Sequence, residues 1–176
     1  VGYLLIDKLI LQDTAPAPQE TTLSESAKAV SAEDSSPSVA VLPFVNMSGD
    51  KDNEYFSDGL TETLLHMLAQ LPELRVAART SSFAFKGKDT GIAEISELLG
   101  VAHVLEGSVQ KAGNRVRVTA QLIRANDGFH VWSQNYDRNL DDIFAIQDEI
   151  AKDVAGALDA SLLGGNNESM LSVDTS

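Results

Sequence analysis

Residues 101–136 decide the fold, and their sequence is VAHVLEGSVQKAGNRVRVTAQLIRANDGFHVWSQNY. It predicts consecutive strands separated by tight turns at Lys111–Asn114 and Asn126–Gly128, the second of which is a strong hairpin signal. The middle strand alternates between apolar and polar residues. Its apolar positions are Val116, Val118, Ala120 and Leu122, and its polar positions are Arg115, Arg117, Thr119 and Gln121. We therefore expect an antiparallel unit that buries one face and exposes the other.

The residues on either side of this unit predict further strands and helices. Short apolar runs indicate strands at 39–44, where Pro43 marks an end or a free edge, and at 74–77. Apolar residues at helical spacing indicate helices at 56–71, at 92–99 before Gly100, and at 143–158 after a cap at Asp141 or Asp142. The order β-α-β-α-β-β-β-α predicts the α/β class, with a single domain and a mixed sheet of about five strands covered by three helices.

The chain divides into four parts. Residues 1–12 are apolar but contain Asp7 and Lys8, so they fit either the end of a membrane helix or a short amphipathic helix. Residues 13–37 are rich in Ala, Pro, Ser, Thr and Glu, which predicts a flexible acidic linker. Residues 38–158 form the expected domain, and residues 159–176, with Gly164 and Gly165, are expected to be a flexible tail.

Composition and motifs exclude several classes of function. The 176 residues carry a net charge of −13 and no cysteine, which disfavours a generic nucleic-acid surface and excludes thiolate metal sites and cysteine nucleophiles. No phosphate-binding glycine motif or Gly-x-Ser-x-Gly sequence is present. The acidic residues at 50–58 miss the spacing of a calcium loop, and the three histidines show no ligand spacing. We expect no metal, no cofactor and no catalytic residues.

Several blocks, taken in order over residues 38–150, resemble the TolB-like amino-terminal domain found in bacteria. They are SVAVLPFVN (38–46), YFSDGLTE (55–62), LRVAARTSSF (74–83), LGVAHVLEGSV (99–109), VTAQLI (118–123), Trp132-Ser133, YDR (136–138) and DIF (142–144). The ordered series is far more specific than any single block.

The resemblance implies a place in a larger protein. Such domains commonly lie between a single membrane helix and tetratricopeptide repeats, with a winged-helix DNA-binding domain or a class III nucleotide cyclase domain at the cytoplasmic end. It implies that residues 1–12 end an inner-membrane helix and that repeats begin after about Leu163. It further implies a non-catalytic periplasmic sensor or interaction domain of a membrane-anchored signalling or transcription-regulatory protein. The implied partners are proteins of the cell envelope, with no nucleic acid bound through this domain.

The polar residues of these blocks are the candidate site. Arg79, Ser81 and Ser82 follow a predicted strand, where exposed donors could bind an anionic group or a partner backbone. Glu106 and Ser108 flank Gly107, whose position within a strand predicts a bulge or a close backbone approach. The remaining candidate, Asp58, precedes Gly59, which is expected to permit close packing of the first helix against the sheet.

Alternative hypotheses remain open. These polar residues could serve only to fix loops and sheet geometry. The domain could be a small-ligand sensor with its site near Arg79, Ser81 and Ser82, or a cytoplasmic scaffold attached to a nucleotide cyclase. An enzyme acting by itself is the third alternative.

Overall fold

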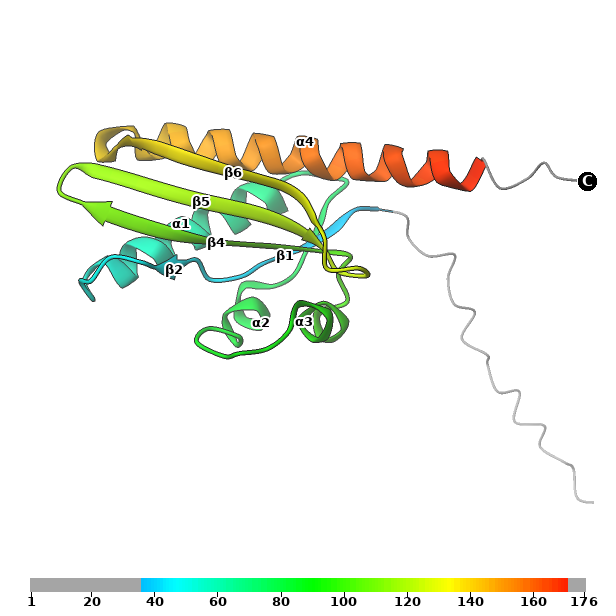
Figure 1. Ribbon diagram of the computed structural model, residues 1–176, viewed down its shortest axis with the longest axis horizontal. Helices are drawn as coiled ribbons and strands as arrows, with labels where there is room; N and C mark the ends of the chain where they lie inside the picture. Colours follow the sequence, from blue (N-terminus) through cyan, green and yellow to red (C-terminus); the bar gives the residue numbers. More distant parts are fainter. Residues whose placement is uncertain (1–35, 171–176) are drawn as a thin grey trace, which may run out of the picture. The chain divides into compact units, whose positions relative to one another are not determined.

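A computed structural model describes the fold of residues 36–170 and the side chains of residues 36–162. Within that part of the chain, six strands form one mixed sheet in the order β3-β1-β4-β5-β6, with β2 also beside β4 (Figure 1). The strands are β1 (Ser38–Val41), β2 (Val45–Asn46), β3 (Arg75–Val76), β4 (His103–Ala112), β5 (Arg115–Arg124) and β6 (His130–Asn139). The predicted α/β class with a mixed sheet is confirmed. The apolar stub at residues 1–12 and the linker up to Ser35 lie outside the described residues.

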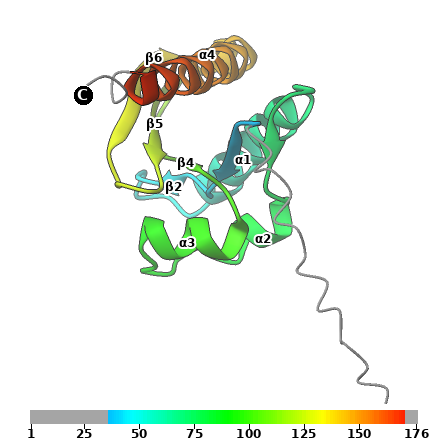
Figure 2. The same cartoon turned by 90° about the vertical axis from the view of Figure 1, so that its right-hand side faces the viewer.

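Helices cover the two faces of the sheet unequally (Figure 2). The long helices α1 (Asn53–Ala69) and α4 (Ile143–Met170) lie on one face, and the short helices α2 (Arg79–Phe83) and α3 (Ile92–Leu99) lie on the other. The main core lies between the sheet and the long helices, and its largest members are Phe44, Leu60, Leu64, Leu68, Leu105, Leu122, Tyr136, Ile146, Ile150 and Leu158. A smaller cluster of Leu42, Ile95 and Val104 lies under α3.

The strand predicted at residues 39–44 is interrupted. β1 and β2 both run parallel to β4, with Val39 opposite His103 and Val45 opposite Ser108, and the segment between them leaves the ladder. Pro43 lies in that segment, where it has no N–H to donate. The next residue, Phe44, donates its backbone N–H to the Thr61 hydroxyl of α1 at 2.9 Å. The hydrogen bond made at this break therefore connects the sheet to α1.

The predicted turns and helix ends are found close to where the sequence indicates them. Gly100 ends α3 in the left-handed conformation, with φ of 64°, and Gly128 has φ of 72° in the turn before β6. Asp141 and Asp142 belong to a 3-10 turn (Leu140–Asp142) directly before α4.

Three local expectations are corrected. The five-residue helix α2 lies in a region where the sequence indicated the end of a strand and a loop, because so short a helix shows no apolar period. The sequence did not predict the two-residue strand β2, because it too is short and is defined only by its pairing with β4. The chain from Gly164, expected to be a loop, continues α4 to Met170, since glycine in a helix costs about 1 kcal/mol without removing a hydrogen bond.

The two glycines singled out from sequence differ in their surroundings. A Cβ built on Gly107 would lie 2.2 Å from the Thr119 carbonyl oxygen and 2.7 Å from the Phe44 ring, so the predicted close approach is confirmed. A Cβ on Gly59 would meet nothing within 4 Å, because this residue lies on the exposed side of α1. The expectation that Gly59 allows close packing against the sheet is wrong.

These surroundings predict opposite effects of the same substitution. Gly107→Ala should lower the free energy of unfolding by about 3 kcal/mol, because the added methyl overlaps a backbone oxygen and a buried ring. Gly59→Ala should raise it by about 1 kcal/mol, because alanine favours the helix and meets no obstacle. Urea denaturation followed by circular dichroism measures both; a Gly107→Ala protein as stable as the wild type would contradict the packing described here.

Candidate functional site

An open groove of about 420 Å³ lies where the short helices stop covering the sheet. We call it the sheet-face groove. One wall is the segment from Leu42 to Met47, another is the loop from Phe85 to Thr90 with Ile92 and Ile95 of α3, and the floor is Glu106–Ser108 of β4 with Gln121 of β5. Val45 and Met47 stand on its rim with 58% and 61% of their surfaces exposed. The groove therefore combines exposed apolar residues, two lysines in one wall and a polar floor.

Polar side chains extend this floor across the uncovered part of the sheet. Glu106 lies opposite Gln121, and Ser108 lies opposite Thr119, whose hydroxyl donates to the Asn135 side chain of β6 at 2.8 Å. These pairs occupy the side of β5 that alternation predicted to be polar. The face away from the core is thus an exposed surface of hydrogen-bonding groups.

Two arginines and one aspartate lie at one end of this polar surface. Arg117 of β5 donates to Asp137 of β6 at 2.8 Å, and Arg115 donates to the other oxygen of the same carboxylate. The hydrogen bonds from Arg117 and Arg115 hold the pKa of Asp137 below its usual value. These arginines therefore form cross-strand ion pairs that join β5 to β6.

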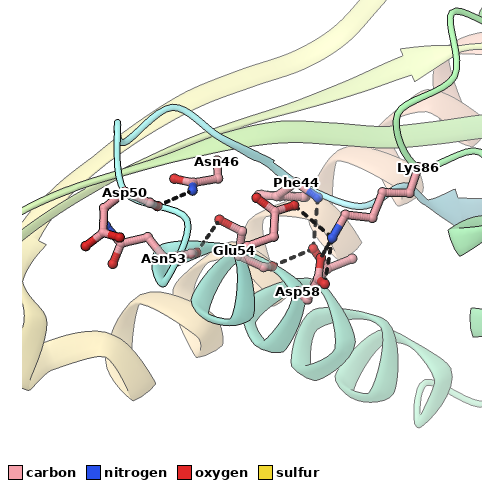
Figure 3. Close-up of polar contacts among 9 residues, drawn as sticks. Phe44, Asn46, Asp50, Asn53, Glu54, Asp58 and Lys86 are labelled. Carbon is pink, nitrogen blue, oxygen red and sulfur yellow. Dashed lines mark hydrogen bonds and ion pairs between the residues drawn. The ribbon is translucent and has the colours of Figure 1, made fainter.

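Lys86, in the wall of the groove, connects the two helical layers around the edge of the sheet (Figure 3). Its ammonium lies 2.6 Å from a carboxylate oxygen of Asp58 and 2.8 Å from one of Glu54, both on α1. Partial burial lowers the pKa of Lys86, but hydrogen bonds to both carboxylates outweigh burial, so the pKa is raised. The hydrogen bond from Lys86 lowers the pKa of Glu54. Lys86 is therefore a charged structural clamp.

A second ion pair extends this clamp. Glu62, one helical turn beyond Asp58, lies 3.3 Å from the Arg79 side chain at the start of α2. The Arg79 guanidinium also lies 4.2 Å from the centre of the Phe83 ring. The carboxylates at positions 54, 58 and 62 thus hold α2 and its following loop against α1.

The structure brings only some of the predicted site residues together. Glu106 and Ser108 share the sheet-face groove, and Asp58 reaches it through its partner Lys86. Arg79 is engaged with Glu62, away from the groove lining. Ser81 is exposed, whereas Ser82 is completely buried. Its hydroxyl has no hydrogen-bond partner among the described residues.

Sequence reasoning did not identify the apolar rim of the groove. The sequence predicts a strand only up to Phe44 and does not show that Val45 and Met47, two residues apart, line the same groove. The available signal was a pair of apolar residues at alternate positions shortly after Pro43.

The arrangement suits binding better than chemistry. Each charged group of the clamp is committed to an ion pair that joins two elements. Within residues 36–162, no three histidine or acidic side chains gather in a way that could hold a metal ion. None of the described helices combines the length and apolar character needed to cross a membrane.

A buried histidine lies at the opposite end of β4 from the turn to β5. His103 is 5% exposed; its Nε2 lies 3.3 Å from the Ser161 hydroxyl of α4, and its Nδ1 has no partner among the described residues. Burial lowers the pKa of His103, and the positive charge of Arg124 adds to this effect; together they outweigh the opposing effect of the Ser38 backbone, which raises the pKa. Folding therefore favours the neutral form of this imidazole relative to the unfolded chain.

The fold and its surfaces can now be compared with known proteins. The family model of the HilA/YgeH-like transcriptional regulator, second domain, matches residues 34–153. The chain belongs to this family. The HilA/YgeH-like second domain spans the whole sheet and α1 to α3, together with the first part of α4. The expectation of a regulator domain is confirmed in this general sense.

Two relatives extend the comparison. The "Putative adenylate cyclase 3" of Rhizobium meliloti (strain 1021) is 51% identical over 132 residues, which are 75% of this chain and 22% of that protein. The chain thus spans about a fifth of this curated relative. TolB from Acinetobacter baumannii has a similar structure, with a TM-score of 0.52 and 15% identity over 70% of this chain and 28% of TolB. This likeness is one of fold, and it agrees with the TolB-like resemblance in the sequence.

The buried imidazole predicts a pH dependence of stability. Between the lowered pKa of His103 and its ordinary value of 6.5, the unfolded chain binds more protons than the folded one. The free energy of unfolding should therefore fall as the pH drops below about 6.5, by about 1.4 kcal/mol for each unit of pKa shift. In His103→Gln, this part of the pH dependence should disappear.

Urea denaturation at a series of pH values tests this prediction. The loss of stability at still lower pH should remain, because it comes from Glu54 and Asp137, whose pKa values are lowered in the folded protein. His130→Gln, at an exposed position of β6, is the matched control and should behave as the wild type. An unchanged slope below pH 6.5 in His103→Gln would contradict the role assigned to burial.

Proposed function

We propose that this HilA/YgeH-like second domain is a non-catalytic protein-interaction domain that binds a protein segment in the sheet-face groove. The observation that carries the proposal is the incomplete cover of the outer sheet face. α2 and α3 leave a groove with exposed apolar residues, Val45 and Met47, beside a row of hydrogen-bonding side chains. Apolar anchors together with polar groups that fix orientation are the usual composition of a binding site.

The charges around the groove support binding without catalysis. Lys86 is held by two carboxylates, and Glu106 lies opposite the amide of Gln121. An acid–base mechanism needs a proton donor and acceptor that converge on one reacting group. In this groove Lys86 instead fastens the loop to α1, Lys88 lies in the same wall, and Glu106 lies on the floor. We therefore assign no enzymatic activity to this domain, and the cyclase named in the relative belongs to that protein.

We further propose that the domain is part of a membrane-anchored bacterial signalling or transcription-regulatory protein and lies on the periplasmic side. The family description and the name of the cyclase relative support a regulatory protein, and the sequence resemblance supports the anchor and the side of the membrane. In this proposal residues 1–12 continue an inner-membrane helix, residues 13–37 are a linker, and repeats follow the domain. The domain's partners are then proteins of the cell envelope.

Site-directed photocrosslinking tests the interaction. A photoreactive benzoylphenylalanine at Met47, on the rim of the groove, should give a defined adduct in cells that express the full-length protein. The same residue at Phe144, which is 76% exposed at the start of α4, is the matched control and should not give it. Ser108→Arg in the Met47 background should abolish the adduct, because the longer side chain fills the groove. Equal adducts from both positions, or an adduct that survives Ser108→Arg, would contradict the proposal.

Protease accessibility tests the location. An epitope-tagged full-length protein should lose residues 38–158 to added protease once the outer membrane has been opened to give spheroplasts, and should resist digestion in intact cells. A cytoplasmic marker protein should survive in the same spheroplasts. Protection of the domain until the inner membrane is lysed would overturn the periplasmic placement and favour a cytoplasmic scaffold.

A further inference from the structure

A second groove lies on the helical side of the domain, between the end of α1 and the middle of α4. Two hollows of about 580 and 210 Å³ meet there and share Leu71 and Ala155. We call their union the α1/α4 groove. Its residues are Met67, Gln70, Leu71, Pro72, Glu73 and Leu74 from the α1 side, Asp148, Ala151, Lys152, Ala155, Leu158 and Asp159 from α4, and Pro37.

The floor of the groove is apolar and partly open to solvent. Leu71 is 38% exposed, and Met67 and Ala155 are half-buried. Leu158, by contrast, is fully buried and belongs to the main core, so the floor is continuous with that core. Contact with a further apolar surface would remove Leu71 and its neighbours from water.

The rim of the groove carries carboxylates that the fold itself does not use. Glu73, Asp148 and Asp159 form no ion pair among the described residues, and the groove has a single ammonium, Lys152. Three carboxylates against one ammonium leave a local charge of −2. The carboxylates of the clamp on the other side of α1 all have a cationic partner. The unused charge therefore points to a cationic occupant, and two copies of a chain with net charge −13 would repel each other here.

The shape of the groove fits a helix. One wall is α4, and the other is the end of α1 with the loop that follows it. The backbone groups of both helices are paired internally, so the helices offer no edge to an added strand. From Asp148 to Asp159 the groove follows α4 for about 16 Å, or about three helical turns, at a rise of 1.5 Å per residue. The small side chains of Ala151 and Ala155 lie one turn apart along this length and leave room for apolar anchors.

We propose that the α1/α4 groove binds an amphipathic helix of a partner protein, with leucine-like anchors on one face and lysine or arginine beside them. This inference goes beyond the proposed function, because it concerns the face of the sheet opposite the sheet-face groove and does not depend on the cellular compartment. The two surfaces could therefore bind two partners at once.

A fluorescent peptide of leucine and lysine at helical spacing, about three to four turns long, is the probe. Its fluorescence anisotropy, measured with the full chain at physiological salt, should show saturable binding. The same peptide with glutamate in place of lysine should bind at least tenfold more weakly. Ala155→Gln, which fills the groove, should weaken binding at least tenfold, and Ala145→Gln, at an exposed position of α4 outside the groove, should leave it unchanged.

A charge variant keeps the test valid if Ala155→Gln proves unstable. Asp148→Lys combined with Asp159→Lys reverses the rim and should also weaken binding at least tenfold. Equal binding to all variants would mean general attraction to an acidic protein and would overturn the proposal. So would self-association of the chain that Ala155→Gln abolishes, because the occupant would then be a second copy. Photocrosslinking from Met47 should be unaffected by Ala155→Gln, so failure here is distinguishable from failure of the proposed function.

Discussion

The ring of Phe44 lies directly over Gly107, and the rest of the domain depends on this contact. A Cβ at position 107 would lie 2.7 Å from the ring, so the ring reaches this depth only because β4 has no side chain there. The backbone of Phe44 is held at the same time by Thr61, which in turn donates to the Ser57 carbonyl at 2.8 Å. One interruption of the first strand thus joins β1, β2, β4 and α1, and it places Val45 and Met47 at the rim of the sheet-face groove.

The two short helices are attached in different ways. Apolar packing around Leu42, Ile95 and Val104 holds α3, whereas the clamp joins Arg79 of α2 and Lys86 of the following loop to three carboxylates of α1. Single exposed ion pairs contribute about 0–1 kcal/mol, but pairs that share one lysine fix a loop more firmly than isolated ones. With this attachment, α2 and α3 lie beside β1 and β4 and leave the outer face of β5 and β6 uncovered (Figures 1 and 2). The polar side chains on that face are exposed or partly exposed.

The sequence predicts best what depends on local pattern. The alternation of β5, the apolar stripe of α1 and the left-handed Gly100 follow from period and backbone preference, and all are found in the structure. β2 and α2 were missed because they are two and five residues long, and tertiary contacts alone select them. The candidate site shows the limit of local pattern more clearly. Asp58 and Arg79 were predicted to be available to a ligand, but each forms an ion pair with a residue far along the chain. A single sequence does not show which distant residues pair. Residues that form structural ion pairs were therefore predicted to form a ligand site.

The distinction between paired and unpaired charge separates the surfaces that hold the fold together from those that are free to bind. Asp137, Glu54, Asp58 and Glu62 each neutralise a basic residue from another element. Removing such a residue would break a link between two elements, at a small cost for each exposed pair, so these charges already serve the fold. The carboxylates beside the α1/α4 groove and the amides and hydroxyls of the sheet-face groove have no such task. If both proposals hold, two partners would bind opposite faces of one sheet and would not compete for the same residues.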